Sequence, residues 1–331
     1  MRNYFAATGR FVRELLGPTY PQREEHLGRD RPFLIFGHRG SPCVLPENTL
    51  TSFDLALEEG ANALELDLCI TKDGQVVCWH DWTPHQTTFF ARWLEFEPHV
   101  KYYPLLPSDK EYWVPVCDLP LDDFRRVYGY KEKRSDKRTD DPIPTFREFM
   151  AWASTQTRLR ALSLDLKIPN ERSDLVHPFM RAINEVIAEY GEGLEIMIEV
   201  TEAGVLKNVL EENHGYDISF DTEASPGFVL FPDTFSSVQR ANDYGLSAAV
   251  PLRPRPITVA PWTTYRRLID HEQALRRSAA GQQRESVRYL IAATINSPKE
   301  MECLIRMGVD GIQTDLPAEL RAVAERLRVP L

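Results

Sequence analysis

The sequence predicts one (β/α)₈ TIM barrel, an α/β fold, with an insertion after the second strand and its hairpin. Eight strand-like segments, each followed by a helical pattern, begin near residues 33, 63, 162, 194, 216, 246, 288 and 309. Strands that alternate with helices are typical of parallel βα architecture, and eight such units fit a closed barrel. A doubly wound dinucleotide fold is not favoured, because no Gly-x-Gly-x-x-Gly sequence opens the first helix.

The first elements have clear local signals. Residues 33–37 are an apolar run, and residues 50–59 have helical spacing. Residues 63–70 alternate with period two, and residues 76–79 are their hairpin partner. Asn48 or Thr49 caps the predicted helix and Gly60 ends it. Residues 71–74, Thr-Lys-Asp-Gly, carry the turn signal of the hairpin. These segments predict the first two barrel strands and the helix between them.

The later units follow the same alternation. Predicted strands lie at residues 162–168, 194–200, 216–221, 246–250, 288–294 and 309–313. Predicted helices lie at about residues 174–190, 203–213, 234–244, 263–279 and 298–307. The chain therefore divides into an N-terminal extension, residues 1–30, and a barrel, residues 31–331.

An insertion at about residues 82–142 interrupts the βα pattern. Eight aromatic residues fall within residues 89–113, too many for a solvated loop. This stretch either packs on the barrel as a subdomain or covers the site as a lid, and Phe90 and Trp93 are its candidate substrate contacts. The charged run at residues 131–141 predicts a solvated, mobile loop.

The first sixteen residues have helical spacing, and the arginines among them exclude a secretory signal peptide. We expect a short helix packed on the body, with a transit peptide or a membrane-surface helix as alternatives. No apolar run approaches the roughly 18 residues of a membrane span.

Composition narrows the function classes. The net charge of −10 disfavours nucleic-acid binding. Five widely spaced cysteines without a Cys-x-x-Cys motif predict a reducing, cytoplasmic environment and no zinc site. These features favour a small-molecule substrate, and they do not indicate an oligomeric state.

Acidic residues repeat on two predicted strands. Glu65 and Asp67 share one strand face, and Asp165 and Lys167 repeat the arrangement, with leucines opposite in both strands. In a barrel the leucine face meets the helices and the charged face meets the interior. Three converging carboxylates predict a Mg²⁺ or Ca²⁺ site near the C-terminal mouth. A buried ion-pair network, such as Lys167 with Glu65, is the alternative.

Two histidines follow predicted strands that lead to the same mouth. His38 comes after the first strand and His80 after the hairpin strand. One can accept a proton while the other donates one, as cleavage of a phosphodiester requires. Arg39 and Lys167 can hold the non-bridging phosphate oxygens.

These residues belong to an ordered series of motifs. The series comprises His38-Arg39-Gly40, Pro46-Glu47-Asn48-Thr49, Glu65-Leu66-Asp67, His80-Asp81 and the Gly-Val-Asp-Gly-Ile-Gln-Thr-Asp-Leu-Pro sequence of residues 308–317. It resembles the glycerophosphodiester phosphodiesterase family over residues 33–317. The resemblance implies a TIM barrel with a divalent cation held by Glu65 and Asp67. It also implies an acid/base pair, His38 and His80, phosphate contacts from Arg39 and Lys167, and a site-shaping acid, Glu47.

Two departures from the family pattern bear on substrate choice. The family usually has Glu where this chain has Asp165, and the Asp165-Leu-Lys167 form resembles sphingomyelinase D-type phospholipases D. Those enzymes lack the His-Arg-Gly and Pro-Glu-Asn-Thr motifs. The family often has Trp-Thr-x-Asn where residues 293–296 read Ala-Thr-Ile-Asn. The aromatic residues at 89–113 can line the side of the pocket that this tryptophan lines in the family.

The sequence therefore predicts hydrolysis of a glycerophosphodiester or sugar phosphodiester to a phosphomonoester and an alcohol. A synthase of agrocinopine-type sugar phosphodiesters is one alternative. Phospholipase D-like cleavage of a lipid headgroup is a second, and a non-catalytic binding barrel is a third.

Overall fold

The computed structural model describes residues 31–84, 100–105, 107–133, 137–220, 237–251, 261–281 and 287–331. Parallel strands pair in the order β8-β7-β6-β2-β1-β11-β10-β9. Their bounds are β1 (Leu34–His38), β2 (Ala63–Ile70), β6 (Ala161–Leu166), β7 (Glu195–Val200), β8 (Asp217–Phe220), β9 (Ala248–Ala249), β10 (Tyr289–Ala292) and β11 (Gly311–Thr314). The end strands β8 and β9 also contact each other, so the row curls into a nearly closed barrel. The predicted barrel is confirmed.

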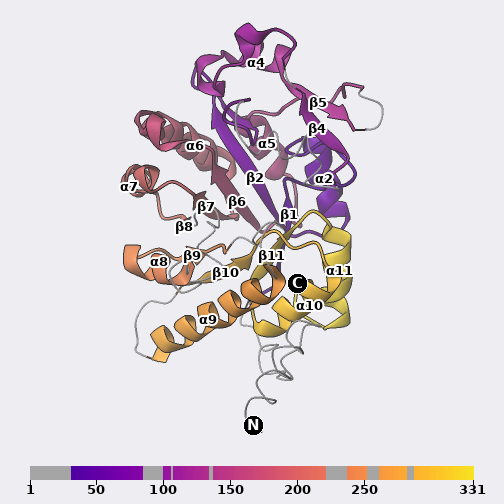
Figure 1. The fold of residues 1–331 in the computed structure, drawn as a ribbon, viewed down its shortest axis with the longest axis vertical. Coiled ribbons are helices and arrows are strands. Elements are labelled where there is room, and N and C mark those ends of the chain that lie inside the picture. Colours follow the sequence, from indigo (N-terminus) through magenta and orange to yellow (C-terminus); the bar gives the residue numbers. More distant parts are fainter. Residues whose placement is uncertain are drawn as a thin grey trace, which may run out of the picture.

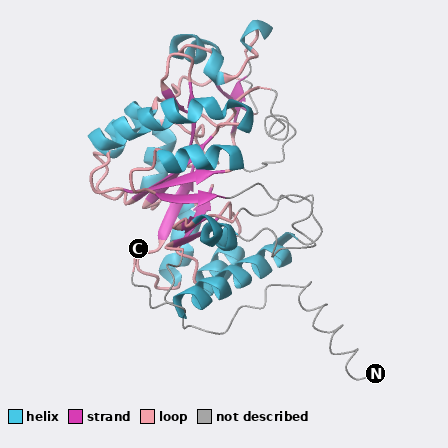
Figure 2. Ribbon diagram, turned by 90° about the vertical axis from the view of Figure 1, so that its left-hand side faces the viewer, coloured by secondary structure: helices cyan, strands magenta, loops and turns pink. Residues whose placement is uncertain are grey.

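Helices follow the strands and lie outside them (Figures 1 and 2). They are α2 (Leu50–Glu58), α5 (Phe146–Ala153), α6 (Val176–Tyr190), α7 (Ala203–Glu211), α8 (Ser237–Tyr244), α9 (Pro261–Gly281), α10 (Pro298–Met307) and α11 (Pro317–Arg326). Thr49 caps α2 by accepting a hydrogen bond from the Ser52 backbone amide, as its sequence predicts. Helical spacing did not predict α5 or α11.

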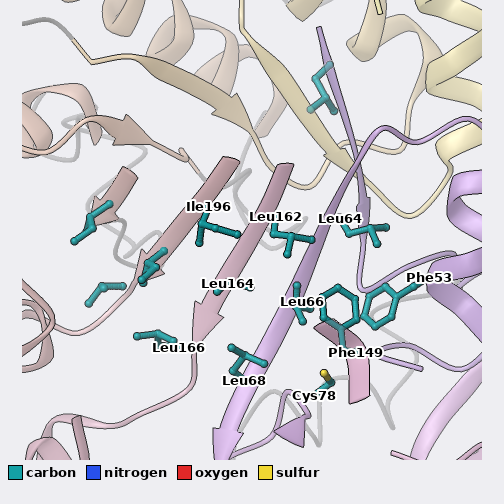
Figure 3. Packing of buried hydrophobic residues seen from close by; sticks show 14 of the residues in the cluster. Phe53, Leu64, Leu66, Leu68, Cys78, Phe149, Leu162, Leu164, Leu166 and Ile196 are labelled. Carbon is teal, nitrogen blue, oxygen red and sulfur yellow. The ribbon is translucent and has the colours of Figure 1, made fainter. Parts of the chain in front are cut away.

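The outward face of the barrel strands is apolar. Leu64, Leu66 and Leu68 follow one another along β2 and belong to the large buried cluster between strands and helices (Figure 3). The rings of Phe53 from α2 and Phe149 from α5 meet edge to face beside them, with centroids 4.8 Å apart. The leucines therefore face the helices, as predicted, and the intervening residues must face the barrel interior.

The interior is layered along the barrel axis. An apolar cluster fills one part of it: Leu34, Phe36, Ala63, Ala161, Met197, Ala248, Val250, Tyr289, Ile291 and Ala293. Two residues beyond Ala63 and Ala161, the same strand faces carry Glu65 and Ser163, which are register partners. Two residues further on, Asp67 pairs with Asp165. Polarity therefore rises toward the carboxyl ends of the strands, where barrel enzymes hold their sites.

The insertion is a small subdomain on this barrel. The hairpin strand β3 (Val76–Cys78) pairs with β2, and β4 (Tyr102–Leu105) pairs with β5 (Gly129–Glu132). The 3₁₀ turns η2 (Lys110–Tyr112) and η3 (Val116–Asp118) and the helix α4 (Leu121–Val127) lie between β4 and β5, at the top of Figure 1.

Aromatic packing joins the insertion to the barrel. Trp79 has its ring centroid 5.7 Å from that of Phe124, 5.6 Å from that of Tyr128 and 5.3 Å from that of Tyr130. The described part of the insertion therefore packs down beside the strand that leads to His80. Phe90 and Trp93 lie outside the described residues, so their predicted role in substrate contact stays a prediction.

The charged run was predicted as a mobile loop, and for part of it this is wrong. Lys131 and Glu132 belong to β5, and Lys131 forms an isolated bridge with Arg138. Arg138 also donates a hydrogen bond to the Tyr128 carbonyl at 2.9 Å. Some of these partners, such as Tyr128 and the residues of β4 that pair with β5, lie outside the run, so its composition alone does not reveal them.

The N-terminal extension, residues 1–30, lies outside the described residues. Within the ranges that the structure describes, no helix combines the length and apolar character needed to cross a membrane.

Candidate active site

Three carboxylates meet at the C-terminal mouth of the barrel. Glu65 and Asp67 come from β2 and Asp165 from β6, and one carboxylate oxygen of each lies within 4.8 Å of the others. Asp165 Oδ1 is buried and accepts no hydrogen bond from the described residues, and Asp67 Oδ1 is buried beside the Lys167 ammonium. Buried carboxylate oxygens at this spacing fit an oxygen-ligated divalent cation. The convergence expected from the two strand patterns is present.

Asn48 anchors Asp67. The Asn48 side-chain amide donates to Asp67 Oδ2 at 2.8 Å, and the Asp67 backbone amide donates to Asn48 Oδ1 at 3.2 Å. Asn48 has a φ of 53°, in the left-handed region that asparagine tolerates better than most residues. The Pro-Glu-Asn-Thr turn therefore fixes one oxygen of Asp67 and leaves Oδ1 toward the cluster.

Arg39 links three acidic groups. Its backbone amide donates to Glu65 Oε2 at 3.0 Å, its Nε lies 2.9 Å from Asp67 Oδ2, and its Nη1 donates to Glu47 Oε2 at 3.1 Å. Glu47 was expected to help shape the site, and it contacts the guanidinium that holds Asp67. The guanidinium is thus oriented by two carboxylates before any substrate binds.

The turn after β1 brings Arg39 to this position. Arg39 has a φ of 56° and Gly40 a φ of 94°. A Cβ atom on Gly40 would lie 2.5 Å from Ser52 Oγ, so the turn requires glycine.

Lys167 bridges two members of the carboxylate cluster. Its Nζ lies 2.5 Å from Asp165 Oδ2 and 3.1 Å from Asp67 Oδ1. Burial disfavours the ammonium, but Asp165 and Asp67 outweigh it and hold the pKa of Lys167 above its usual value. The ion-pair network considered from the sequence is present, with these two aspartates as the partners of Lys167.

Each histidine is held by an aspartate. His38 Nδ1 lies 2.6 Å from Asp315 Oδ1, and His80 Nδ1 lies 2.8 Å from Asp81 Oδ1. The opposite ring nitrogen of His38, Nε2, is 3.8 Å from Glu65 Oε2. A carboxylate on Nδ1 orients each ring and leaves Nε2 as the atom that exchanges a proton.

Asp315 is itself fixed by Asn296. The Asn296 amide donates to Asp315 Oδ2 at 2.5 Å, and Asn296 Oδ1 accepts from the Asp315 backbone amide at 2.9 Å. Thr314 Oγ1 donates to the same Asn296 oxygen at 3.0 Å. The sequence motifs contain Asp81, Asn296 and Asp315 but do not by themselves indicate a role for them. Their position directly after a histidine or a strand was the available signal.

The pKa values of Glu65 and Asp67 are shifted in opposite directions. Burial and the charge of Asp67 raise the pKa of Glu65 well above its usual value. Burial also acts on Asp67, but Arg39, Lys167 and His80 outweigh it and lower the pKa of Asp67. Two neighbouring carboxyls with opposite shifts indicate an excess of negative charge, which a bound divalent cation would neutralise.

Residues 38–319 match the Glycerophosphoryl diester phosphodiesterase family. The chain belongs to this family. The resemblance inferred from the motifs is confirmed, and the match spans every candidate residue from His38 to Asp315. As a member of the glycerophosphodiester phosphodiesterase family, the chain is classed with the phosphoric diester hydrolases. The catalytic and ligand roles of its individual residues stay predictions.

Curated relatives match to different extents. Protein YqiK of Bacillus subtilis is 24% identical over 294 residues, which are 87% of this chain and 97% of YqiK. Glycerophosphodiester phosphodiesterase domain-containing protein 4 of Macaca fascicularis is 30% identical over 176 residues. That match covers 50% of this chain and 26% of the macaque protein, so the chain spans about a quarter of that relative.

Solved structures share the barrel. A glycerophosphoryl diester phosphodiesterase of Silicibacter pomeroyi DSS-3 superimposes with a TM-score of 0.65 at 19% identity, over 92% of this chain and 98% of that one. A phosphodiesterase of Oleispira antarctica, solved with the product sn-glycerol-3-phosphate, gives a TM-score of 0.60 at 18% identity. This second match covers 89% of this chain and 97% of the other. At these identities the likeness shows the fold.

Proposed function

We propose that this glycerophosphodiester phosphodiesterase family member hydrolyses a small glycerophosphodiester or sugar phosphodiester to a phosphomonoester and an alcohol. The main observation in support of this proposal is that two histidine–aspartate pairs adjoin one carboxylate cluster. His38 lies beside Glu65, and the charge of His80 acts on Asp67. The Oleispira antarctica relative, solved with sn-glycerol-3-phosphate as its product, supports a glycerophosphate-type product here.

The chain's own residues can divide the work of phosphodiester cleavage. Lys167 presents a partly buried ammonium, and Arg39 a guanidinium already aligned by Glu47, to the non-bridging oxygens of the phosphate. Of the two histidines, one accepts a proton at Nε2 from the attacking hydroxyl or water. The other donates a proton from Nε2 to the leaving oxygen. Asp315 and Asp81 hold the rings in the orientation that this exchange needs.

Glu65, Asp67 and Asp165 would hold the divalent cation. Their all-oxygen set suits Mg²⁺ or Ca²⁺ better than zinc, because neither histidine nor cysteine belongs to the cluster. When bound, the cation supplies positive charge that neutralises the phosphate.

Product analysis by ³¹P NMR tests the proposal. The panel contains glycerophosphodiesters with small headgroups, a sugar phosphodiester and a lysophospholipid, each incubated with Mg²⁺, Ca²⁺ or EDTA. We expect a phosphomonoester from a small diester and no product with EDTA. His38→Ala and His80→Ala should each lower kcat by about 10²-fold or more. His177→Ala is the matched control, because His177 pairs with Glu212 on the surface.

The same panel separates the alternatives. Consumption of an alcohol with formation of a new diester would identify a synthase. Cleavage of the lysophospholipid alone would identify a phospholipase D-like enzyme. No turnover of any diester with either cation would overturn the proposal.

A substrate with an activated leaving group separates the two histidines. An ester of p-nitrophenol needs little proton donation, because the phenolate leaves readily. The variant that lacks the proton donor should therefore regain activity on this substrate. The variant that lacks the acceptor should not.

A further inference from the structure

Glu199 on β7 is a buried carboxylate inside the barrel that the proposed mechanism does not use. Its side chain is 6% exposed. The oxygen Oε1 accepts hydrogen bonds from Ser163 Oγ and from Gln313 Nε2, both at 2.5 Å. Two neutral donors thus meet on one oxygen of an acid that is costly to bury.

The bond from Gln313 crosses the barrel, whereas the bond from Ser163 comes from the neighbouring strand β6. Strand β7 stands four strands from β11 in either direction around the barrel, so Glu199 and Gln313 come from opposite sides. Ser163 is the inward residue two positions before Asp165, and Gln313 comes two positions before Asp315. The two hydrogen bonds to Glu199, which we call the Glu199 bridge, therefore lie one layer below the mouth. Asp165, a candidate cation ligand, lies above Ser163, and Asp315, the partner of His38, lies above Gln313.

The Glu199 bridge also lies beside Glu65, another candidate cation ligand. Ser163 is the register partner of Glu65 on β2, and Asp165 is the register partner of Glu199. The next layer of the interior is filled by apolar side chains such as Phe36 and Met197. A Leu or Met at position 199 would fill space as well, so packing does not require a carboxylate here.

We propose that Glu199 is a positioning residue for the cation site. By tying β6 and β11 to β7, it sets the separation between the carboxylate cluster and the His38–Asp315 pair. The cation-site part of this inference rests on the proposed function. The positioning role requires the hydrogen-bond acceptor at Glu199 Oε1, whereas a role as a direct cation ligand would require the negative charge of Glu199.

Two substitutions test whether the site needs the hydrogen-bond acceptor of Glu199 or its negative charge. Glu199→Gln keeps a side-chain oxygen that can accept from Ser163 and Gln313, and it removes the charge. Glu199→Met keeps similar volume and removes the acceptor, so both donors lose their partner.

The experiment measures Ca²⁺ and Mg²⁺ binding to the full chain by calorimetry, together with kcat and KM for the best small diester. Losing a residue that orients metal ligands typically weakens metal binding about 10- to 100-fold, and we expect Glu199→Met to fall in this range. Its kcat should fall by a similar factor with KM changed less. Glu199→Gln should stay within about threefold of wild type in both measurements.

Glu272 is the matched control. It is a fully buried glutamate on α9 that accepts hydrogen bonds from the backbone amides of Ser237 and Val238, at 2.8 Å and 3.0 Å. Glu272→Met removes a comparable pair of bonds far along the chain from the cluster. It should lower the melting temperature and leave cation affinity unchanged.

Ser163→Ala supplies a second test if Glu199→Met does not fold. It removes one donor and one oxygen atom, and it should weaken cation binding in the same direction with a smaller change. Wild-type cation affinity in folded Glu199→Met, or in Ser163→Ala, overturns the proposal. Equal weakening in Glu199→Gln and Glu199→Met also overturns it, because the charge would then be the essential feature. Cation binding needs no substrate, so this result stands apart from failure of the proposed hydrolysis.

Discussion

His38 and His80 have the same side-chain arrangement, although His38 ends β1 and His80 follows β3. In each, an aspartate oxygen lies within 2.8 Å of Nδ1. The two aspartates differ in position, because Asp315 exchanges two hydrogen bonds with Asn296 whereas Asp81 directly follows its histidine. The His38 ring is therefore held through residues that lie far along the chain.

Asp315→Ala should lower kcat about tenfold or more while KM changes little, since the His38 ring loses the group that orients it. Steady-state kinetics measures kcat and KM together. A normal kcat in Asp315→Ala would remove Asp315 from the mechanism.

Lys167→Met should have opposite effects on binding and turnover. The ammonium lies within 3.1 Å of Asp67 and Asp165, so its removal should strengthen cation binding by about tenfold. Turnover should fall because the phosphate loses a charged partner. Calorimetry with Ca²⁺ checks the first effect, with the exposed Lys299→Met as control. Weaker cation binding in Lys167→Met would show that the lysine supports the cluster instead of competing with a cation.

At the scale of an element, α5 shows how a cap fixes a helix against the hairpin. Thr145 and Glu148 form a capping box, and the carbonyl of Pro144 accepts a hydrogen bond from Cys78 of β3. Burial favours the neutral form of Glu148, but bonds from Thr145 and Arg125 outweigh it and lower its pKa. The ionised carboxylate therefore stabilises the native state.

Glu148→Gln should lower the melting temperature by about 2–4 °C at pH 7, the usual scale for loss of a helix cap. Because the native pKa is depressed, the stabilisation is complete above the unfolded value of about 4.3 and is lost as pH falls below it. Thermal melts of both proteins at pH 3 to pH 7 should thus converge at the acid end. A constant difference across this range would contradict the assignment.

At the element scale, the described part of the insertion lies next to the site. This part packs on Trp79, directly before His80. For the aromatic stretch we retain the sequence prediction that Phe90→Ala with Trp93→Ala raises KM for a large sugar or lipid diester. Bis-p-nitrophenyl phosphate should be comparatively unaffected, because it needs fewer contacts. Equal losses on both substrates, with a lower melting temperature, would assign the stretch a structural role.

For the whole molecule, cation binding and folding should be linked. Asp67 and Asp165 come from neighbouring strands, so the cation site exists only when the barrel is formed. A ligand at 100 times its dissociation constant stabilises the native state by about 2.7 kcal/mol. We expect Ca²⁺ or Mg²⁺ to raise the melting temperature and EDTA to reverse the rise.

Glu65→Gln is the control for this linkage. It should fold but show little or no cation-dependent rise in melting temperature, since one of three carboxylate charges is gone. A wild-type rise in Glu65→Gln would place the bound cation elsewhere.

The sequence by itself determined the barrel, its strand starts and the candidate cluster. These depend on local information: period-two alternation places Glu65 and Asp67 on one face, and the strand ends of a parallel barrel share one mouth. The cap at Thr49 is local in the same way. The family resemblance rested on motifs that are short and contiguous.

Only the tertiary structure decided which side chains meet across the barrel. His38 and Asp315 are 277 residues apart, and Glu199 and Gln313 are 114 apart. Lys167 pairs with Asp165 and Asp67, whereas the ion-pair alternative considered from the sequence had Glu65 as its example partner. The packing of Phe124 and Tyr130 on Trp79 was equally hidden. Such contacts depend on barrel closure and on the stagger between strands, which arise from the packing of all the strands together and leave no period in the local sequence.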